Sequence, residues 1–224
     1  MLFIIEDNNN KHRLYSIGDN TSFSCGLGEG VPKAKSVSLC KHCENLEFKE
    51  IYARNVASAA ITTSGTLYLF GINPIEVNEC PTLYDFNGDV IVDDVAICNT
   101  HMVVLVREKV DGVYRRKVYA GGNNEHAACG KNGKIHEIDF FSNNDEAVPI
   151  KIKVGYDRTY VMTVNAKEIL NNKNDIEDTV SFIYDKEGDL LQKLKAFYRS
   201  DKSERFTNLY KSLNKNTLVS FLNL

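Results

Sequence analysis

The amino-acid sequence predicts a mostly β protein built from repeated units of about 52 residues. The pattern Gly18-Asp-Asn20-x₄-Cys25-Gly26 returns 104 residues later as Gly122-Asn-Asn124-x₄-Cys129-Gly130. Gly71-Ile-Asn73 lies between them, at steps of 53 and 51 residues. Each Gly-x-Asn also follows a predicted β-hairpin. A repeat of this length is typical of solenoids and propellers, which usually present binding surfaces.

The three hairpins are each predicted from two β-branched or aromatic runs joined by Gly, Asn or Asp. They pair residues 2–6 with 12–17, 58–62 with 66–70, and 102–107 with 113–120. In the first two hairpins the returning run is apolar almost throughout, which favours a strand buried on both faces. The glycine after it permits a sharp turn, and the Asn two residues later is expected to satisfy exposed backbone groups.

A second recurring segment precedes the returning strands. Residues 51–61, 95–105 and 152–162 align with one another, each with an apolar residue at its start and an apolar run at its end. The third copy ends near Val164, and residues 179–184 are predicted as the returning strand of a fourth hairpin. No Gly-x-Asn follows that strand, so the fourth unit is partial.

Together these motifs resemble the repeat of the regulator of chromosome condensation family over residues 1–164. The resemblance implies a partial or open β-propeller of about three to four blades, with units near 1–50, 51–94, 95–150 and, in part, 151–184. It also implies a role as structural repeat turns for eight residues, which are Gly18, Asn20, Gly26, Gly71, Asn73, Gly122, Asn124 and Gly130. The repeats are degenerate, since the family's conserved histidine is present once, as His101.

The periodic pattern stops before the chain does. Asp189-x-x-Gln192 and Asp201-x-x-Glu204 are capping boxes ahead of amphipathic stretches, which predicts a short α-helical C-terminal segment over residues 185–224. Propellers need four or more blades to close a ring. The sequence therefore leaves open whether residues 1–184 form an open arc or are completed by another chain. It equally leaves open whether the tail caps the arc or binds a partner.

Motifs for catalysis or metal binding are weak in this chain. Cys40-Lys-His-Cys43 is a C-x₂-C motif with no second pair at zinc-site spacing. Cys25 and Cys129 are interpreted as small buried side chains, and His101 as a hydrogen-bonded structural residue. We therefore expect no metal, no cofactor and no enzymatic activity.

Charge separates the tail from the rest of the chain. The net charge is −3, yet residues 186–224 hold eight Lys/Arg and four Asp/Glu, leaving −7 on residues 1–185. Phosphate contacts from this tail would come from seven candidates, which are Lys193, Lys195, Arg199, Lys202, Arg205, Lys211 and Lys215. No leader or membrane-spanning run is apparent, so a cytoplasmic or nuclear location is expected.

The first functional hypothesis is a non-enzymatic protein-interaction module, an adaptor or subunit of a larger assembly. The second, implied by the family resemblance, is a nucleotide-exchange regulator of a small GTPase. The third is association with a ribonucleoprotein or chromatin particle through the basic tail, which would weaken steeply with salt.

Overall fold

The computed structural model describes residues 1–110, 113–142, 144 and 147–165. Within them lie thirteen β-strands and one short 3₁₀ turn, η1 (Asp139–Phe141). The strands form four antiparallel sheets that follow one another along the chain. The described part is therefore mostly β, as the sequence predicts. The predicted helices over 185–224 and the predicted strand over 179–184 lie outside the described residues.

The sheets are numbered in chain order. The first holds β1 (Leu2–Glu6), β2 (His12–Asp19) and β3 (Lys33–Leu39). The second holds β4 (Phe48–Arg54), β5 (Ala57–Thr62), β6 (Leu67–Ile72) and β7 (Val77–Tyr84). The third holds β8 (Val90–Ile97), β9 (His101–Val110), β10 (Val113–Gly122) and β11 (Gly133–Glu137). The fourth holds β12 (Val148–Val154) and β13 (Thr159–Val164).

The three hairpins predicted from the sequence are confirmed. They are β1–β2, β5–β6 and β9–β10, each antiparallel and each followed by its Gly-x-Asn turn. The turn fixes the correspondence between sheets, because β2, β6 and β10 all lead into it. By this correspondence β1 matches β5 and β9. The strands β4, β8 and β12, which we call the first strands, precede β5, β9 and β13.

Three hydrophobic clusters lie between neighbouring sheets, and a smaller one around Cys25, Leu27 and Ala34 lies within the first unit. Along β9, the side chains of Met102 and Val104 join the cluster shared with the second sheet, while Val103 and Leu105 join the one shared with the fourth. This alternation follows from the two-residue period of a strand. Each middle sheet is thus covered on both faces, as in a propeller blade.

Strand β2 differs from the expectation of burial on both faces. Leu14 and Ser16 are fully buried, but Tyr15 and Ile17 on the opposite face are only half-buried. In the matching strand β6, Tyr68 is half-buried as Tyr15 is, but Phe70, at the position of Ile17, is fully buried. The reason is position in the arc, because among the described residues no further sheet packs on the outer face of the first sheet.

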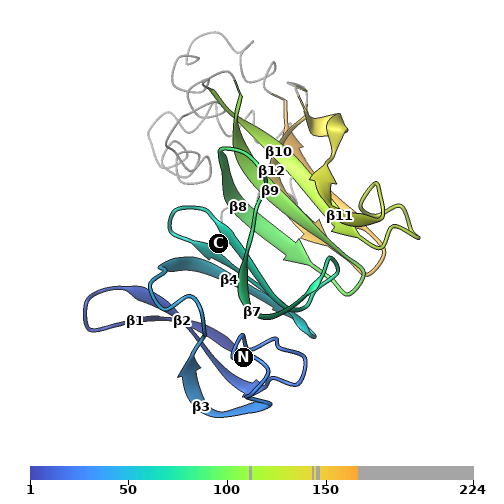
Figure 1. Ribbon diagram of the computed structural model, residues 1–224. Coiled ribbons are helices and arrows are strands. Elements are labelled where there is room, and N and C mark those ends of the chain that lie inside the picture. The colour runs from blue at the N-terminus through green and yellow to red at the C-terminus, as the bar shows by residue number, and fades with distance from the viewer. Residues whose placement is uncertain (111–112, 143, 145–146, 166–224) are drawn as a thin grey trace, which may run out of the picture.

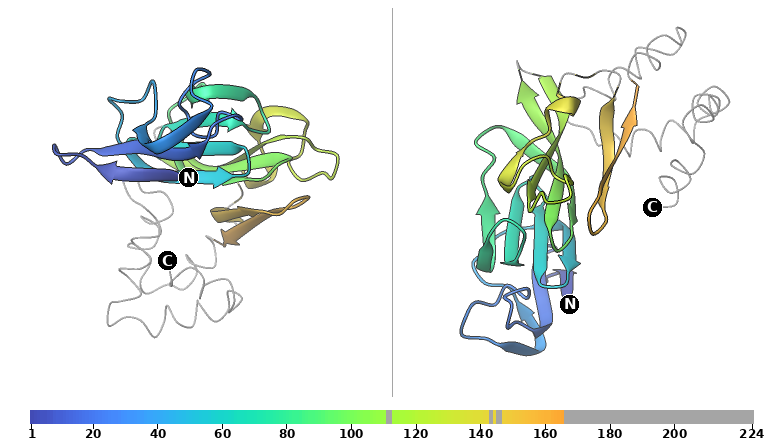
Figure 2. Two further views of the ribbon diagram at one scale, coloured as in Figure 1. Left: turned by 90° about the horizontal axis from the view of Figure 1, so that it is seen from below. Right: turned by 90° about the vertical axis from the view of Figure 1, so that its right-hand side faces the viewer.

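The sheets stack in an arc (Figure 1), with the first sheet at one end and β8–β11 toward the other. Strands β12 and β13 lie behind the third sheet, as the right-hand view of Figure 2 shows. The arrangement is a partial β-propeller whose first strands share one side of the molecule. No helix in the described part is both long and apolar enough to cross a membrane.

Candidate functional site

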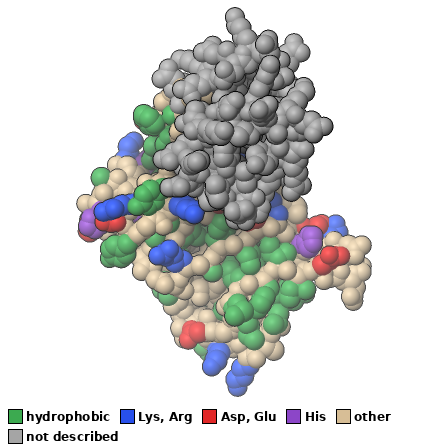
Figure 3. Space-filling view, turned by 180° about the vertical axis from the view of Figure 1, so that it is seen from behind, with side chains coloured by type: hydrophobic (Ala, Val, Ile, Leu, Met, Phe, Trp, Pro, Cys, Tyr) green, Lys and Arg blue, Asp and Glu red, His purple; other side chains and the backbone are tan. Residues whose placement is uncertain are grey.

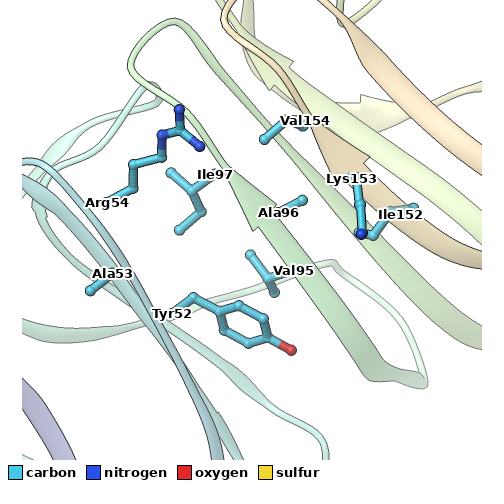
Figure 4. Close-up of a pocket in the computed structure, with 9 residues that line it drawn as sticks. All are labelled: Tyr52, Ala53, Arg54, Val95, Ala96, Ile97, Ile152, Lys153 and Val154. Atoms are coloured by element: carbon cyan, nitrogen blue, oxygen red, sulfur yellow. The ribbon is translucent and has the colours of Figure 1, made fainter. Parts of the chain in front are cut away.

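A groove of about 330 Å³ runs across the first strands of three successive sheets. It is lined by three residues from each of β4, β8 and β12, which are Tyr52, Ala53, Arg54, Val95, Ala96, Ile97, Ile152, Lys153 and Val154 (Figure 4). Strands that are far apart in sequence meet here because every unit places its first strand on the same side. The groove is therefore a product of the repeat architecture.

The groove combines an apolar floor with two cations. Val95, Ile97 and Ile152 are buried at its base, whereas Arg54 and Lys153 are exposed. Figure 4 shows Arg54 and Tyr52 on the side of β4 that faces β8, and Ala53 on the other side. Within the described residues neither Arg54 nor Lys153 is in an ion pair. Such a surface suits a partner that offers both apolar and anionic groups.

A titratable cluster lies beside the groove. The Tyr52 hydroxyl donates a hydrogen bond to Asp94 Oδ1 at 3.0 Å and also contacts the Glu50 carboxylate. Burial raises the pKa of Asp94 to about 6; the hydrogen bond from Tyr52 opposes this rise and the Glu50 charge adds to it. Burial, followed by the Asp94 charge, also raises the pKa of Tyr52. The cluster joins the second and third sheets through a partly buried carboxylate.

The repeat turns of the sequence analysis are distributed over three sheets and do not converge on one site. Gly71 shows why the turn needs glycine. Its φ is +82°, and a Cβ there would lie 2.2 Å from the backbone oxygen of Val56. Gly122 is similar, with a φ of +124° and 2.4 Å to the oxygen of Thr100. Gly18, Gly26 and Gly130 also have positive φ and lie in the corresponding turns.

The Asn of each turn accepts backbone hydrogen bonds. Asn20 Oδ1 accepts from the Cys25 N–H at 3.0 Å, and Asn124 Oδ1 accepts from the Cys129 N–H at 2.9 Å. This shared bond explains the fixed spacing between Asn and Cys in the two copies. Asn73 instead accepts from Ile75 and Glu76, in a shorter turn that includes Pro74.

The cysteines of the C-x₂-C motif are buried thiols. Cys40 and Cys43 donate hydrogen bonds to the backbone oxygens of Cys25 and Cys40, respectively. Burial raises the pKa of each thiol to about 12, so both are protonated near neutral pH. No group of three metal-ligating side chains gathers in the described part of the chain.

His101 is fully buried between the third and fourth sheets, and its structural interpretation is confirmed. Its Nε2 lies 3.0 Å from the Thr159 hydroxyl, which donates to the Ala128 backbone oxygen. Its Nδ1 lies 3.1 Å from Cys98 Sγ. Burial lowers the pKa of this imidazole. The residue therefore serves as a neutral connector between two sheets.

The basic candidates of the tail, Lys193 to Lys215, lie outside the described residues. The groove itself was not predicted from sequence, although its signal was present. The aligned segments that begin at Ile51, Val95 and Ile152 contain the three groove-lining strands. Alignment alone could not show that these strands lie side by side.

Sheets of this number and arrangement define the class of the molecule, a partial β-propeller. No protein-family model and no curated protein sequence matches the chain. Solved structures do match. Yeast RCC1 (Prp20), in its crystal structure bound to Kap60, aligns with a TM-score of 0.51 and 15% identity, over 77% of this chain and 43% of that chain.

Two further solved structures match with slightly lower TM-scores. Human WBSCR16 aligns with a TM-score of 0.49 and 18% identity, over 67% of this chain and 40% of that one. Prp20p from Saccharomyces cerevisiae aligns with a TM-score of 0.49 and 13% identity, over 67% of this chain and 38% of that one. The chain thus spans less than half the length of these proteins. The fold is RCC1-like.

Proposed function

We propose that this chain is a non-enzymatic protein-interaction module, and that its partner binds in the groove on the first strands. The observation that carries the proposal is the combination of half-buried apolar lining residues, Tyr52, Ala96 and Val154, with the exposed cations of Arg54 and Lys153. A partner gains affinity by covering these half-buried side chains and specificity by placing anionic groups against the two cations. The yeast protein of RCC1-like fold is itself known in complex with a protein, Kap60.

The test is quantitative affinity capture with the full chain. Arg54→Glu combined with Lys153→Glu reverses both cations without touching the floor of the groove. The matched control is Lys35→Glu combined with Lys131→Glu, at two exposed cations away from it. We expect a defined set of proteins to be lost with the groove variant and retained with the control. Equal recovery with both variants would refute binding through the groove.

The second candidate function is nucleotide exchange on a small GTPase, and the observation that favours it is the RCC1-like fold. A panel of GTPases loaded with a fluorescent nucleotide would test it. Acceleration of nucleotide release by the full chain, lost in the groove variant, would support this role. The absence of acceleration across the panel would remove it and leave the interaction module in place.

A further inference from the structure

Among the described residues, the first sheet has no strand at the place that β4 and β8 take in the second and third sheets. In the second and third sheets the first strand, β4 or β8, pairs antiparallel with the next strand, β5 or β9. Strand β1 matches β5 and β9, but among the described residues it pairs with β2 alone. Its other edge therefore lies where the remaining sheets carry a first strand.

Within the described part of the chain, the backbone of β1 has hydrogen-bonding groups at this edge that no other strand pairs with. Met1 and Ile17 bond to each other in both directions, at 2.8 and 3.0 Å, and the Asp7 N–H bonds to the Lys11 oxygen at 2.8 Å. Since antiparallel pairs alternate, Phe3 and Ile5 also direct their backbone groups toward β2. Leu2, Ile4 and Glu6 then direct theirs toward the open edge.

The side chains of β4 show what is missing beside this edge. Val95 and Ile97 on β8, with exposures of 2% and 6%, are covered from the second sheet, whose Tyr52 packs against their cluster. Ile51 and Ala53 are the matching positions on β4, facing the first sheet. Ile51 is only half-buried and Ala53 is exposed. A strand beside β1 would cover them with the side chain that stands opposite Leu2.

Charge adds a further requirement. Glu6 ends β1 as an exposed carboxylate, and the Nε2 atom of His12 lies 3.7 Å from its Oε2 atom. A strand antiparallel to β1 begins beside Glu6, so a cation near its start would be favourable. Figure 3 views the molecule from the side on which β12 and β13 lie, and hydrophobic side chains gather on that side of the molecule.

We propose that an extended segment of a partner protein adds to β1 as the first strand of this sheet. It runs antiparallel to β1, with Lys or Arg near the position opposite Glu6 and an apolar side chain opposite Leu2. The backbone bonds supply affinity, and the covering of Ile51 and Ala53 supplies selectivity. Ala53 also borders the groove, but its side chain lies on the other side of β4 from those of Tyr52 and Arg54, so the cations of the groove can be changed without altering this surface.

The experiment uses the full chain and a labelled synthetic peptide with the sequence of β4, Phe48–Arg54. This peptide fits because β4 fills the same place in the second sheet. Lys49 lies near its start, and Tyr52 stands opposite Ala59, the residue of β5 that matches Leu2. Hydrogen exchange should slow at the amides of Leu2, Ile4 and Glu6 when the peptide binds. The amides of Phe3 and Ile5, already bonded to β2, should not change.

Three variants separate the contributions. Glu6→Pro removes one edge donor without affecting the bonds to β2 and should weaken binding about fivefold. Glu6→Ala retains the N–H and should weaken it about twofold. Ala53→Asp should weaken it about tenfold by placing a charge under the apolar side chain. Val77→Asp, at an exposed residue of β7, is the matched control and should bind as the wild type does.

The proposal is overturned if the peptide protects none of the three amides, or if Glu6→Pro binds as tightly as the wild type. It is also overturned if these amides are already protected in the free chain. In that case residues of the chain itself or of a second copy occupy the edge. The groove variant Arg54→Glu with Lys153→Glu should bind this peptide normally, which keeps the outcome distinct from that of the groove test.

Discussion

The middle sheets and the first sheet of the arc share one pattern of residues but bury it differently. In β5 every residue is buried, because the first and third sheets cover its two faces. In the corresponding strand β1, Leu2 and Ile4 are half-buried and Ile5 is 40% exposed. The burial of a sheet in this fold therefore depends on the sheets that pack against its two faces. Its stability and its free surfaces are both set by what lies beside it.

Removing core side chains from the two regions should show the largest effect. Leu69→Ala empties a fully buried position of the second sheet and should lower the free energy of unfolding by about 2–5 kcal/mol. Ile4→Ala in β1 should cost about 1–2 kcal/mol, since its side chain is half-buried. Urea denaturation measures both. Equal losses would contradict the difference between middle and end sheets.

The turn glycines should follow next in size. Gly71→Ala combines a positive φ with a contact to backbone and should cost about 3 kcal/mol or more. Gly133→Ala has a positive φ of +100° but open space, so about 1–2 kcal/mol is expected. Gly30 has no positive φ in this range and no atom close to the added Cβ, so Gly30→Ala should leave the free energy of unfolding nearly unchanged. Thermal denaturation would reveal the order, and a neutral Gly71→Ala would disprove the role of this turn.

Asp94 makes the junction between the second and third sheets sensitive to pH. Because its pKa is raised to about 6 in the folded chain, its contribution to stability is full below the ordinary value near 3.8 and is lost as the pH rises through 6. Asp94→Asn should therefore stabilise the protein at pH 8 by about 1–2 kcal/mol and have little effect at pH 4. Asp157→Asn, at a residue outside the junction, is the control. A stabilisation independent of pH would contradict this explanation.

The smallest effect is expected for the cations of the groove. Arg54→Glu with Lys153→Glu changes two exposed side chains and should alter the free energy of unfolding by about 0.5 kcal/mol or less. Urea denaturation of this variant beside the wild type provides the measurement. A large loss of stability would mean that these residues support the fold, and the capture experiment would then not report on binding.

Much of the fold could be predicted from the sequence because it depends on local chemistry. The Gly-x-Asn turns and the three hairpins follow from residue type and spacing, and the structure confirms them. The half-burial of Ile17, whose counterpart Phe70 is fully buried, could not be predicted in this way. Residue types show that a strand can be covered on both faces, but they do not show whether a neighbouring sheet is there.

The groove was missed for a related reason. Each of its three strands is visible in the sequence as a recurring apolar segment. Whether the three strands lie side by side depends on how successive sheets pack on one another, which the segments do not show. Arg54 and Lys153 can be recognised as parts of one site only when the structure shows that both line the same groove as Val95, Ile97 and Ile152. No local pattern in the sequence carries that information.

Hydrogen exchange in the full chain tests the central claim, that the edge of β1 left without a partner strand in the described part of the chain is open in solution. The comparison is between Leu2 and Ile4 of β1 and the matching Ala59 and Ile61 of β5, whose backbone groups bond to β4. We predict exchange at least about a hundredfold faster at Leu2 and Ile4. Equally slow exchange at all four amides would show that the edge of β1 is already paired, and would contradict the claim.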